Sequence, residues 1–283
     1  MKFQPVIKWS GSKRSQSEEI IARIKDVEYD TYYEPFCGGC SVLFQLLHSD
    51  KKFKRYVCSD INADLISLWN MIKDNPSKII KEYEKMWNEL NIDDDKERKK
   101  NYYYMVRERF NKHKNPCDFM FIMRTTTNGM PRYNKNGEFN NSFHVTRDGI
   151  KPKTLEKIIL QWSSLLNKFN VQFIKVDYTK IVPSENDLLY LDPPYANTKG
   201  MYYGKINYNK MWEWLRLQKC DYILSFDGKT SSVDMTYEVP TDIYTTHEYL
   251  YSGNSSFRRV IGTSNSEYVR ESLYIKYNRI FAE

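Results

Sequence analysis

An acid, two prolines and an aromatic residue follow one another at residues 192–195, directly after the apolar run 188–191. Each proline lacks a backbone N–H and has a fixed φ, so the pair cannot continue a central strand and stiffens the loop that follows. Such a loop can present two hydrogen-bond acceptors, the Asp192 carboxylate and the Pro193 carbonyl. The alternative interpretation, a rigid structural loop, explains the prolines but neither flanking residue.

The chemistry that suits this loop is attack by the amino nitrogen of a nucleobase. That nitrogen is a poor nucleophile because its lone pair is delocalised into the ring, and two acceptors at its N–H bonds would draw it towards tetrahedral geometry. Tyr195 offers a face on which a base taken out of a duplex can stack. We therefore predict that Asp192, Pro193, Pro194 and Tyr195 form a catalytic set.

A second candidate motif is the Gly-Gly turn within residues 37–40, which lies between a strand-like run and a helical segment. Adjacent glycines let backbone approach a ligand closely, and Ser41 is placed to cap the following helix. Asp60 lies 21 residues beyond Gly39. An acid at about that distance accepts hydrogen bonds from ribose hydroxyls in nucleotide-binding α/β folds, so the pair favours a nucleoside-containing cofactor over a structural turn.

A third motif is IKWSGSKR at residues 7–14. Here Trp9 and Gly11 could shape a pocket wall, and Lys8 or Lys13 could meet an anion. The structural alternative is an ordinary amino-terminal arm whose Trp9 packs on the core. The motif alone does not distinguish a carboxylate ligand from a phosphate.

The predicted elements place these residues at one edge of a sheet. Short β-rich runs alternate with helical periodicity at 42–47, 64–72 and 155–169, which favours a mainly parallel α/β sheet covered on both faces. In such sheets, ligands sit beyond the carboxyl ends of the strands. The predicted strands are 32–33, 56–58, 171–176, 188–191 and 222–224, and the polar residues that end them are Glu34, Asp60, Asp177, Asp192 and Ser225.

The middle of the chain differs in composition. From about residue 75 to 148 it is rich in charged and aromatic residues, with helical stretches at 78–90 and 97–112. NKNGEF at 134–139 has the form of a hairpin turn. We predict an inserted, mostly helical subdomain at 76–148 that carries a projecting β-hairpin, within a main domain made of 1–75 and 149–283.

Composition limits the remaining possibilities. The formal charge of +7 suits a polyanionic partner without requiring one, and 41% hydrophobic residues is enough for a core. No stretch is long and apolar enough to span a membrane, and the amino terminus lacks the apolar region of a secretory signal, so we expect a cytoplasmic protein with no membrane partner. The five cysteines and four histidines lack the spacing of a metal site, so no metal is expected.

Together these motifs resemble those of the Dam family of DNA adenine-N6 methyltransferases (class D12) over nearly the whole chain. IKWSGSKR (7–14) resembles the amino-terminal motif, EPFCGGCS (34–41) the S-adenosylmethionine motif and LDPPY (191–195) the catalytic motif. NGMPRYNKNGEF (128–139) resembles the recognition hairpin. The motif order resembles the α arrangement of amino-methyltransferases, which implies a Rossmann-like methyltransferase fold that binds S-adenosylmethionine.

The resemblance also implies roles for individual residues. Asp60 would hold the cofactor ribose and Asp177 would lie near its adenine amino group. The full set expected to bind the cofactor is Trp9, Gly11, Lys13, Glu34, Phe36, Gly38, Asp60, Asp177 and Asp192. Arg132 and Met130 would contact bases, and Arg124 and Lys135 phosphates. The full set expected to bind DNA is Arg124, Asn128, Met130, Arg132 and Lys135, although Pro131 and Tyr133 depart from the family's aliphatic residues.

The expected reaction is methyl transfer from S-adenosylmethionine to N6 of adenine in a specific double-stranded DNA sequence, by base flipping. Three alternatives stay open: cytosine-N4 methylation, a catalytically silent nucleic-acid-binding protein of the same fold, and an RNA or protein methyltransferase. The recognition site is not indicated, and GATC is a guess from relatives. Nor does the sequence say whether the protein is solitary, phage-encoded or part of a restriction-modification system. A monomer or weak dimer on DNA is expected, in a bacterial or phage-infected cell.

Overall fold

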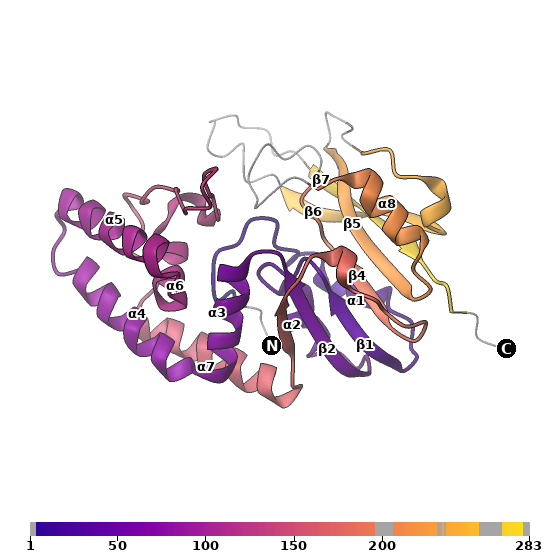
Figure 1. Ribbon diagram of the computed structural model, residues 1–283, viewed down its shortest axis with the longest axis horizontal. Helices are drawn as coiled ribbons and strands as arrows, with labels where there is room; N and C mark the ends of the chain where they lie inside the picture. The colour runs from indigo at the N-terminus through magenta and orange to yellow at the C-terminus, as the bar shows by residue number, and fades with distance from the viewer. Residues whose placement is uncertain (1–3, 196–205, 231–233, 235, 255–267, 280–283) are drawn as a thin grey trace.

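A single sheet organises the molecule (Figure 1). The computed structural model describes residues 4–195, 206–230, 234, 236–254 and 268–279. These residues form a seven-stranded sheet in the order β3-β2-β1-β4-β5-β7-β6. The strands are β1 (Tyr29–Glu34), β2 (Phe53–Asp60), β3 (Gln172–Lys175), β4 (Leu188–Leu191), β5 (Asp221–Thr230), β6 (Thr246–Asn254) and β7 (Tyr268–Lys276).

The strands from β3 to β5 run parallel, whereas β7 is antiparallel to both β5 and β6. The strand order reverses between β1 and β4, which is the switch point where α/β sheets bind ligands. The predicted mainly parallel, Rossmann-like α/β fold is confirmed. The antiparallel pair β6 and β7 was not predicted.

Helices cover both faces of the sheet, as buried parallel strands require. They are α1 (Ser17–Ala22), α2 (Ser41–Leu46), α3 (Ala63–Asp74), α4 (Pro76–Leu90), α5 (Lys96–His113), α6 (Pro116–Thr125), α7 (Pro152–Lys168) and α8 (Tyr208–Arg216). Alternate residues of β4 enter two different cores. Leu188 and Tyr190 belong to the cluster that includes residues of α1, α2, α3 and α7, whereas Leu189 and Leu191 belong to the cluster that includes residues of α8.

β5 is longer than its sequence pattern predicted. The apolar run 222–224 predicted an end at Ser225, but the strand continues to Thr230. The Ser225 side chain is 2% exposed, and its hydroxyl lies 3.0 Å from the hydroxyl of Tyr190. Ser225 therefore pairs with a polar group inside the sheet, and the prediction that it ends a strand at the site was wrong.

The segment 76–148 forms a helical layer beside the sheet, at the left of Figure 1. α6 lies at its centre, since every residue from 117 to 125 is buried and α6 contacts α3, α4 and α5. The predicted helices 78–90 and 97–112 correspond to α4 and α5, whereas α6 was not predicted. α7 then returns along α3 and α4. Among the described helices, none has both the length and the apolar character needed to cross a membrane.

The turn predicted at 134–139 is confirmed. Gly137 adopts φ +76°, the left-handed conformation that such hairpin loops require. An isolated bridge between Tyr133 and Phe139 joins the two arms, in place of longer strands. The Asn111 side chain of α5 makes two hydrogen bonds to the Phe139 backbone, at 2.8 and 3.0 Å. The hairpin is therefore held against α5 by side-chain contacts.

A bulge distorts β5 next to β7. The register between the two strands shifts between Phe226 and Lys229. Gly228 lies in this bulge, and a Cβ there would stand 1.9 Å from the Arg270 carbonyl oxygen and 2.7 Å from Glu271 Cα. Since no side chain fits in that space, the close approach of the strands depends on glycine.

Replacing Gly228 with alanine tests this dependence. We expect Gly228→Ala to lower the free energy of unfolding by about 3 kcal/mol, because the new Cβ overlaps the β7 backbone and forces the strands apart. Urea denaturation followed by circular dichroism measures the change. A loss below about 0.5 kcal/mol, typical of an unconstrained surface substitution, would show that the strands adjust without strain.

Candidate functional site

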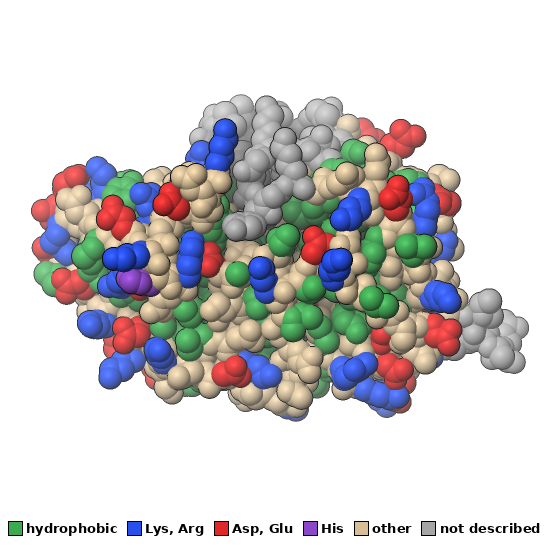
Figure 2. All heavy atoms as spheres, in the orientation of Figure 1, with side chains coloured by type: hydrophobic (Ala, Val, Ile, Leu, Met, Phe, Trp, Pro, Cys, Tyr) green, Lys and Arg blue, Asp and Glu red, His purple; other side chains and the backbone are tan. Residues whose placement is uncertain are grey.

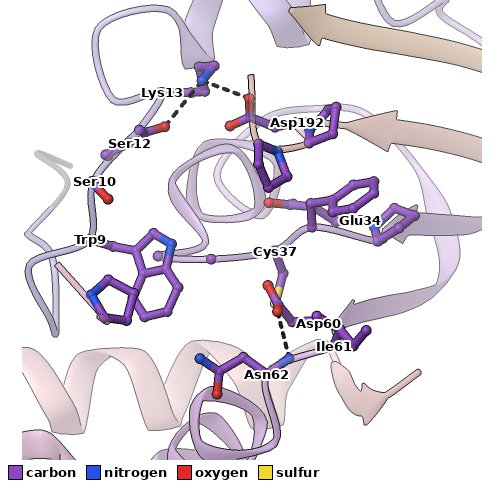
Figure 3. Close-up of a pocket in the computed structure, with 18 of the residues that line it drawn as sticks. Trp9, Ser10, Ser12, Lys13, Glu34, Cys37, Asp60, Ile61, Asn62 and Asp192 are labelled. Atoms are coloured by element: carbon purple, nitrogen blue, oxygen red, sulfur yellow. Dashed lines mark hydrogen bonds and ion pairs between the residues drawn. The ribbon is translucent and has the colours of Figure 1, made fainter. Parts of the chain in front are cut away.

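The residues predicted to do chemistry meet in one cavity of about 870 Å³ at the carboxyl edge of the parallel strands. Figure 3 shows Trp9, Glu34, Asp60 and Asp192 around it. Asn128 and Met130 of the inserted layer complete one side of its wall. The predicted catalytic and cofactor residues that line the cavity are Trp9, Gly11, Lys13, Glu34, Phe36, Gly38, Asp60, Asp177, Asp192, Pro193, Pro194 and Tyr195.

Lys13 holds the acid of the 192–195 loop. Its ammonium lies 2.8 Å from Asp192 Oδ1 and 3.3 Å from Glu271 Oε2, and it donates to the Gly11 carbonyl at 3.2 Å. The Lys13 side chain is only 4% exposed. An ammonium has three N–H donors, so these three oxygens use all of them.

Burial and neighbouring charges separate the pKa values of the acids in the cavity. Burial raises the pKa of Asp192 to about 6, although the Lys13 ammonium opposes the shift. Burial also raises the pKa of Glu34 to about 8, against a hydrogen bond from the Tyr32 hydroxyl at 2.7 Å. At neutral pH, Asp192 is therefore a carboxylate and Glu34 a neutral acid. For Lys13, burial lowers the pKa, but the two carboxylates outweigh it and raise the pKa overall.

The loop that carries Asp192 is fixed by two tyrosines. The Tyr195 hydroxyl donates to Glu271 Oε2 at 2.7 Å, and the Lys13 ammonium lies 4.9 Å from the centre of the Tyr195 ring. The Tyr208 hydroxyl donates to the Pro194 carbonyl at 2.9 Å. None of the described residues donates to the Pro193 carbonyl, so within that part of the chain it is not committed to another partner.

The Gly-Gly turn is packed under the indole of Trp9. Gly38 has φ +45°, and a Cβ there would stand 2.8 Å from Trp9 Nε1, so this turn requires glycine. The predicted helix cap was wrong: Cys40, at φ 54°, occupies the cap position of α2 without a side-chain bond. The Ser41 hydroxyl instead accepts the backbone N–H of Lys13 at 3.0 Å, which joins the turn to the amino-terminal segment.

Asp60 and Asp177 lie at the ends of β2 and β3, as the sequence predicted. Burial raises the pKa of Asp60 to about 6, against backbone N–H donors that include Asn62 at 2.9 Å. Burial also opposes ionisation of Asp177, but the backbone N–H and hydroxyl of Thr179, at 2.9 and 2.6 Å, outweigh it and lower its pKa below the usual value. Both carboxyls are therefore held by their own loops and face the cavity.

The predicted phosphate contact at Arg124 is not supported. Its side chain is 6% exposed and donates to the Pro5 carbonyl. Burial lowers the pKa of Arg124 to about 10, which still leaves it charged at neutral pH. Arg124 sits near the end of the fully buried helix α6, and this burial excludes a contact with a phosphate on the surface.

Arg132 and Lys135 are exposed on the hairpin, outside the cavity. On the face shown in Figure 2, Lys and Arg side chains are interspersed with Asp and Glu, so the +7 charge is not gathered into one patch on that face. The hairpin cations therefore lie outside the cavity lining, which itself includes the cations Lys8, Lys13, Arg147 and Lys210.

Glu271 is the main site residue that sequence reasoning missed. It lines the cavity, but it comes from β7, which runs against the parallel strands. A search for polar residues after apolar runs finds only the carboxyl ends of strands. Glu271 stands near the beginning of its strand, and that end reaches the same edge of the sheet only because β7 is antiparallel.

A second missed link ties the hairpin to the loop that carries Asp60. The Tyr133 hydroxyl donates to Asp64 Oδ2 at 2.8 Å and accepts from Asn62 Nδ2 at 3.4 Å. Asn62 caps α3 and donates its N–H to Asp60. Tyr133 therefore anchors the hairpin on the loop that carries Asp60, which gives a structural reason for a polar aromatic residue at this position.

Removing the Tyr133 hydroxyl tests this anchor. We expect Tyr133→Phe to lower the free energy of unfolding by about 1–2 kcal/mol, because it removes a hydrogen bond to a carboxylate. Chemical denaturation measures the loss. Tyr104→Phe is the matched control, since the described residues give its hydroxyl no hydrogen bond. Equal stabilities for the two variants would show that the Tyr133 contact contributes nothing.

Comparisons with known proteins agree on one family. The family model described as D12 class N6 adenine-specific DNA methyltransferase matches residues 9–266. The Type II methyltransferase M.MjaIII of Methanocaldococcus jannaschii is 36% identical over 209 residues, which cover 69% of this chain and 70% of that protein. The DNA adenine methylases of Escherichia coli (strain K12) and Haemophilus influenzae are 32% and 28% identical, over 69% of this chain. The matches span 66% and 65% of those two proteins, about two thirds of their length.

Proposed function

Because the chain belongs to the D12 class of N6 adenine-specific DNA methyltransferases, we propose that it flips an adenine out of duplex DNA and methylates N6 beside Asp192. The family's activity is the methylation of adenine in DNA, and the proposal concerns how this chain performs it. The observation that carries it is that one cavity at the sheet edge collects the residues of both predicted sites. It holds Asp192 and Tyr195 together with Asp60 and the Gly-Gly turn at 38–39.

S-adenosylmethionine is the methyl donor of this family, and the residues present fit it. A volume of about 870 Å³ falls within the roughly 300–1,000 Å³ of small-molecule sites. Asp60 would accept hydrogen bonds from the ribose hydroxyls, and Asp177 from the adenine amino group. The wall of Trp9, Gly11, Glu34, Phe36 and Gly38 would border the methionine end. Lys13 has its three donors engaged, so we assign it to holding Asp192.

The bound sulfonium supplies an activated methyl group, so the chain itself needs to position the nucleophile. Asp192 would accept one N–H of the target amino group, since its pKa near 6 leaves it ionised at neutral pH. The Pro193 carbonyl would accept the other, and the Tyr195 ring would stack on the flipped base. Asp192 orients the amino group and need not remove its proton before transfer, because alignment alone can lower a barrier by as much as ~7–11 kcal/mol.

Recognition of the sequence around that adenine belongs to the inserted subdomain, residues 76–148. Asn128 and Met130 reach the cavity wall, so the hairpin would meet DNA next to the flipped base. Arg132 would contact a guanine edge, the commonest specific base contact of arginine, and Lys135 a phosphate. A monomer or weak dimer on double-stranded DNA, in the cytoplasm of its cell, stays a prediction.

Labelled product analysis tests the reaction directly. The protein is incubated with radiolabelled cofactor and duplex or single-stranded DNA, and the DNA is digested to nucleosides. We expect label on N6-methyladenine, with the duplex preferred. Label on cytosine, or no label from a folded protein that binds the cofactor, would contradict the proposal. Methylation-sensitive sequencing of DNA from expressing cells then gives the target sequence.

The two cavity acids should respond differently to substitution. We expect Asp192→Ala to lower kcat by about 100-fold or more, because it removes a group that acts on the reacting amino group, while the cofactor Kd stays nearly constant. Asp177→Ala should instead raise the cofactor Kd. Calorimetry and steady-state kinetics separate the two effects. A wild-type rate for Asp192→Ala would refute its role.

Substitutions of the two hairpin cations, Arg132 and Lys135, should also have different effects on DNA binding. Arg132→Ala is expected to cost about 1–3 kcal/mol on the cognate site and to relax specificity at one base pair, because a base contact is lost. Lys135→Ala, the matched control, should weaken binding to every sequence alike and reduce its salt dependence. Binding to cognate and single-substituted duplexes measures both. A uniform loss for Arg132→Ala would identify a phosphate contact.

A further inference from the structure

Glu271 touches both groups that surround Asp192. Its Oε2 accepts the Tyr195 hydroxyl at 2.7 Å and lies 3.3 Å from the Lys13 ammonium. Lys13 in turn lies 2.8 Å from Asp192 Oδ1. The Glu271 side chain is 21% exposed and lines the cavity. One carboxylate oxygen thus links a strand near the carboxyl terminus to the amino-terminal segment and to the 192–195 loop.

A bulge in β5 lies directly opposite Glu271 in the sheet. Phe226 of β5 pairs with Ser272 of β7, and Lys229 pairs with Arg270. The two β5 residues between them, 227 and 228, therefore stand opposite the single residue Glu271. Bulges near active sites re-aim side chains. Gly228 in this bulge lets the β5 backbone approach Glu271 Cα more closely than a Cβ would allow. The position of Glu271 therefore follows from a specific distortion of the sheet.

We propose that Glu271 is a positioning residue for the methyl transfer: it fixes the Tyr195 ring and shares the Lys13 ammonium with Asp192. This inference rests on the proposed function. Glu271 does not touch the reacting atoms and acts through its two neighbours. By holding the ring through its hydroxyl, it sets the plane on which the flipped adenine stacks. By binding Lys13, it prevents that cation from pairing with Asp192 alone.

The shared cation keeps Asp192 available as an acceptor. Paired with Lys13 alone, the Asp192 charge would be largely neutralised, and the carboxylate would bind an amino group less strongly. With Glu271 present, one cation faces two carboxylates, and the three groups together keep a net negative charge. That charge lies where an amino group must be polarised. Among the described residues, the titratable groups that face Asp192 are Lys13, Glu34, Tyr190, Tyr195 and Glu271.

The pH profile of the reaction gives a readout that a purely structural role would not change. The wild-type kcat/KM should fall as the pH drops through about 6, where Asp192 takes up a proton. The negative charge of Glu271 raises the pKa of Asp192, after the larger effect of burial and against the effect of Lys13. Removing that charge should therefore move the acidic limb to lower pH.

Glu271→Gln is the central variant, because it keeps the size and an acceptor oxygen but removes the charge. We expect kcat to fall about 10-fold, as for loss of a hydrogen bond to a charged group, with the acidic limb shifted downward and the cofactor Kd nearly unchanged. Glu248→Gln is the matched control. Glu248 lies on β6 and pairs with Arg23 at 2.9 Å, outside the cavity, so both kcat and the pH profile should stay as in the wild type.

A double-mutant cycle with Tyr195→Phe tests the contact without using activity. A hydrogen bond to a carboxylate is about twice as strong as one to a neutral amide. Tyr195→Phe should therefore lower the free energy of unfolding less in the Glu271→Gln background than in the wild type. Additive losses would overturn the contact. Wild-type kcat with an unmoved acidic limb in Glu271→Gln would overturn the positioning role, whereas a folded wild-type protein that methylates no adenine would count against the proposed function itself.

Discussion

The site depends on the contacts that the buried Lys13 ammonium makes with its three oxygen partners. A charge that is almost fully removed from water is stable only when its donors are paired. Lys13 pairs with the Gly11 carbonyl, Asp192 and Glu271, and it is 4% exposed. These contacts bring together the amino-terminal segment, the loop after β4 and the strand β7. Loss of any partner would leave a buried charge unsatisfied, so the arrangement constrains three distant parts of the chain at once.

Around this cation, two largely buried acids differ in protonation. Glu34 has a pKa of about 8 and Asp192 of about 6, so one is neutral and the other ionised at neutral pH. The difference follows from their partners, since Glu34 receives a hydrogen bond from a neutral tyrosine and Asp192 faces an ammonium. An ionised carboxylate in a largely buried site can accept hydrogen bonds from a weakly nucleophilic amino group.

The inserted helical layer and the Asp60 side of the cavity are parts of one continuous structure. Asn111 holds the hairpin against α5, and Tyr133 holds it against the first turn of α3. The loop that begins α3 also carries Asp60. The hairpin, which we propose contacts DNA, is thus anchored beside the Asp60 loop, which we propose binds the cofactor. Both ligands would therefore lie against the same wall of the cavity.

The sequence by itself determined the alternation of strands and helices, and with it the meeting of Glu34, Asp60, Asp177 and Asp192 at one sheet edge, because parallel strands end on the same side. Local patterns also indicated the glycine turn and the hairpin turn. Only the tertiary structure decided that Ser225 pairs inside the sheet, that Ser41 binds the Lys13 backbone, that Arg124 is buried and that Glu271 enters the cavity. Each of these depends on a partner far away in the chain, and local periodicity carries no information about such partners.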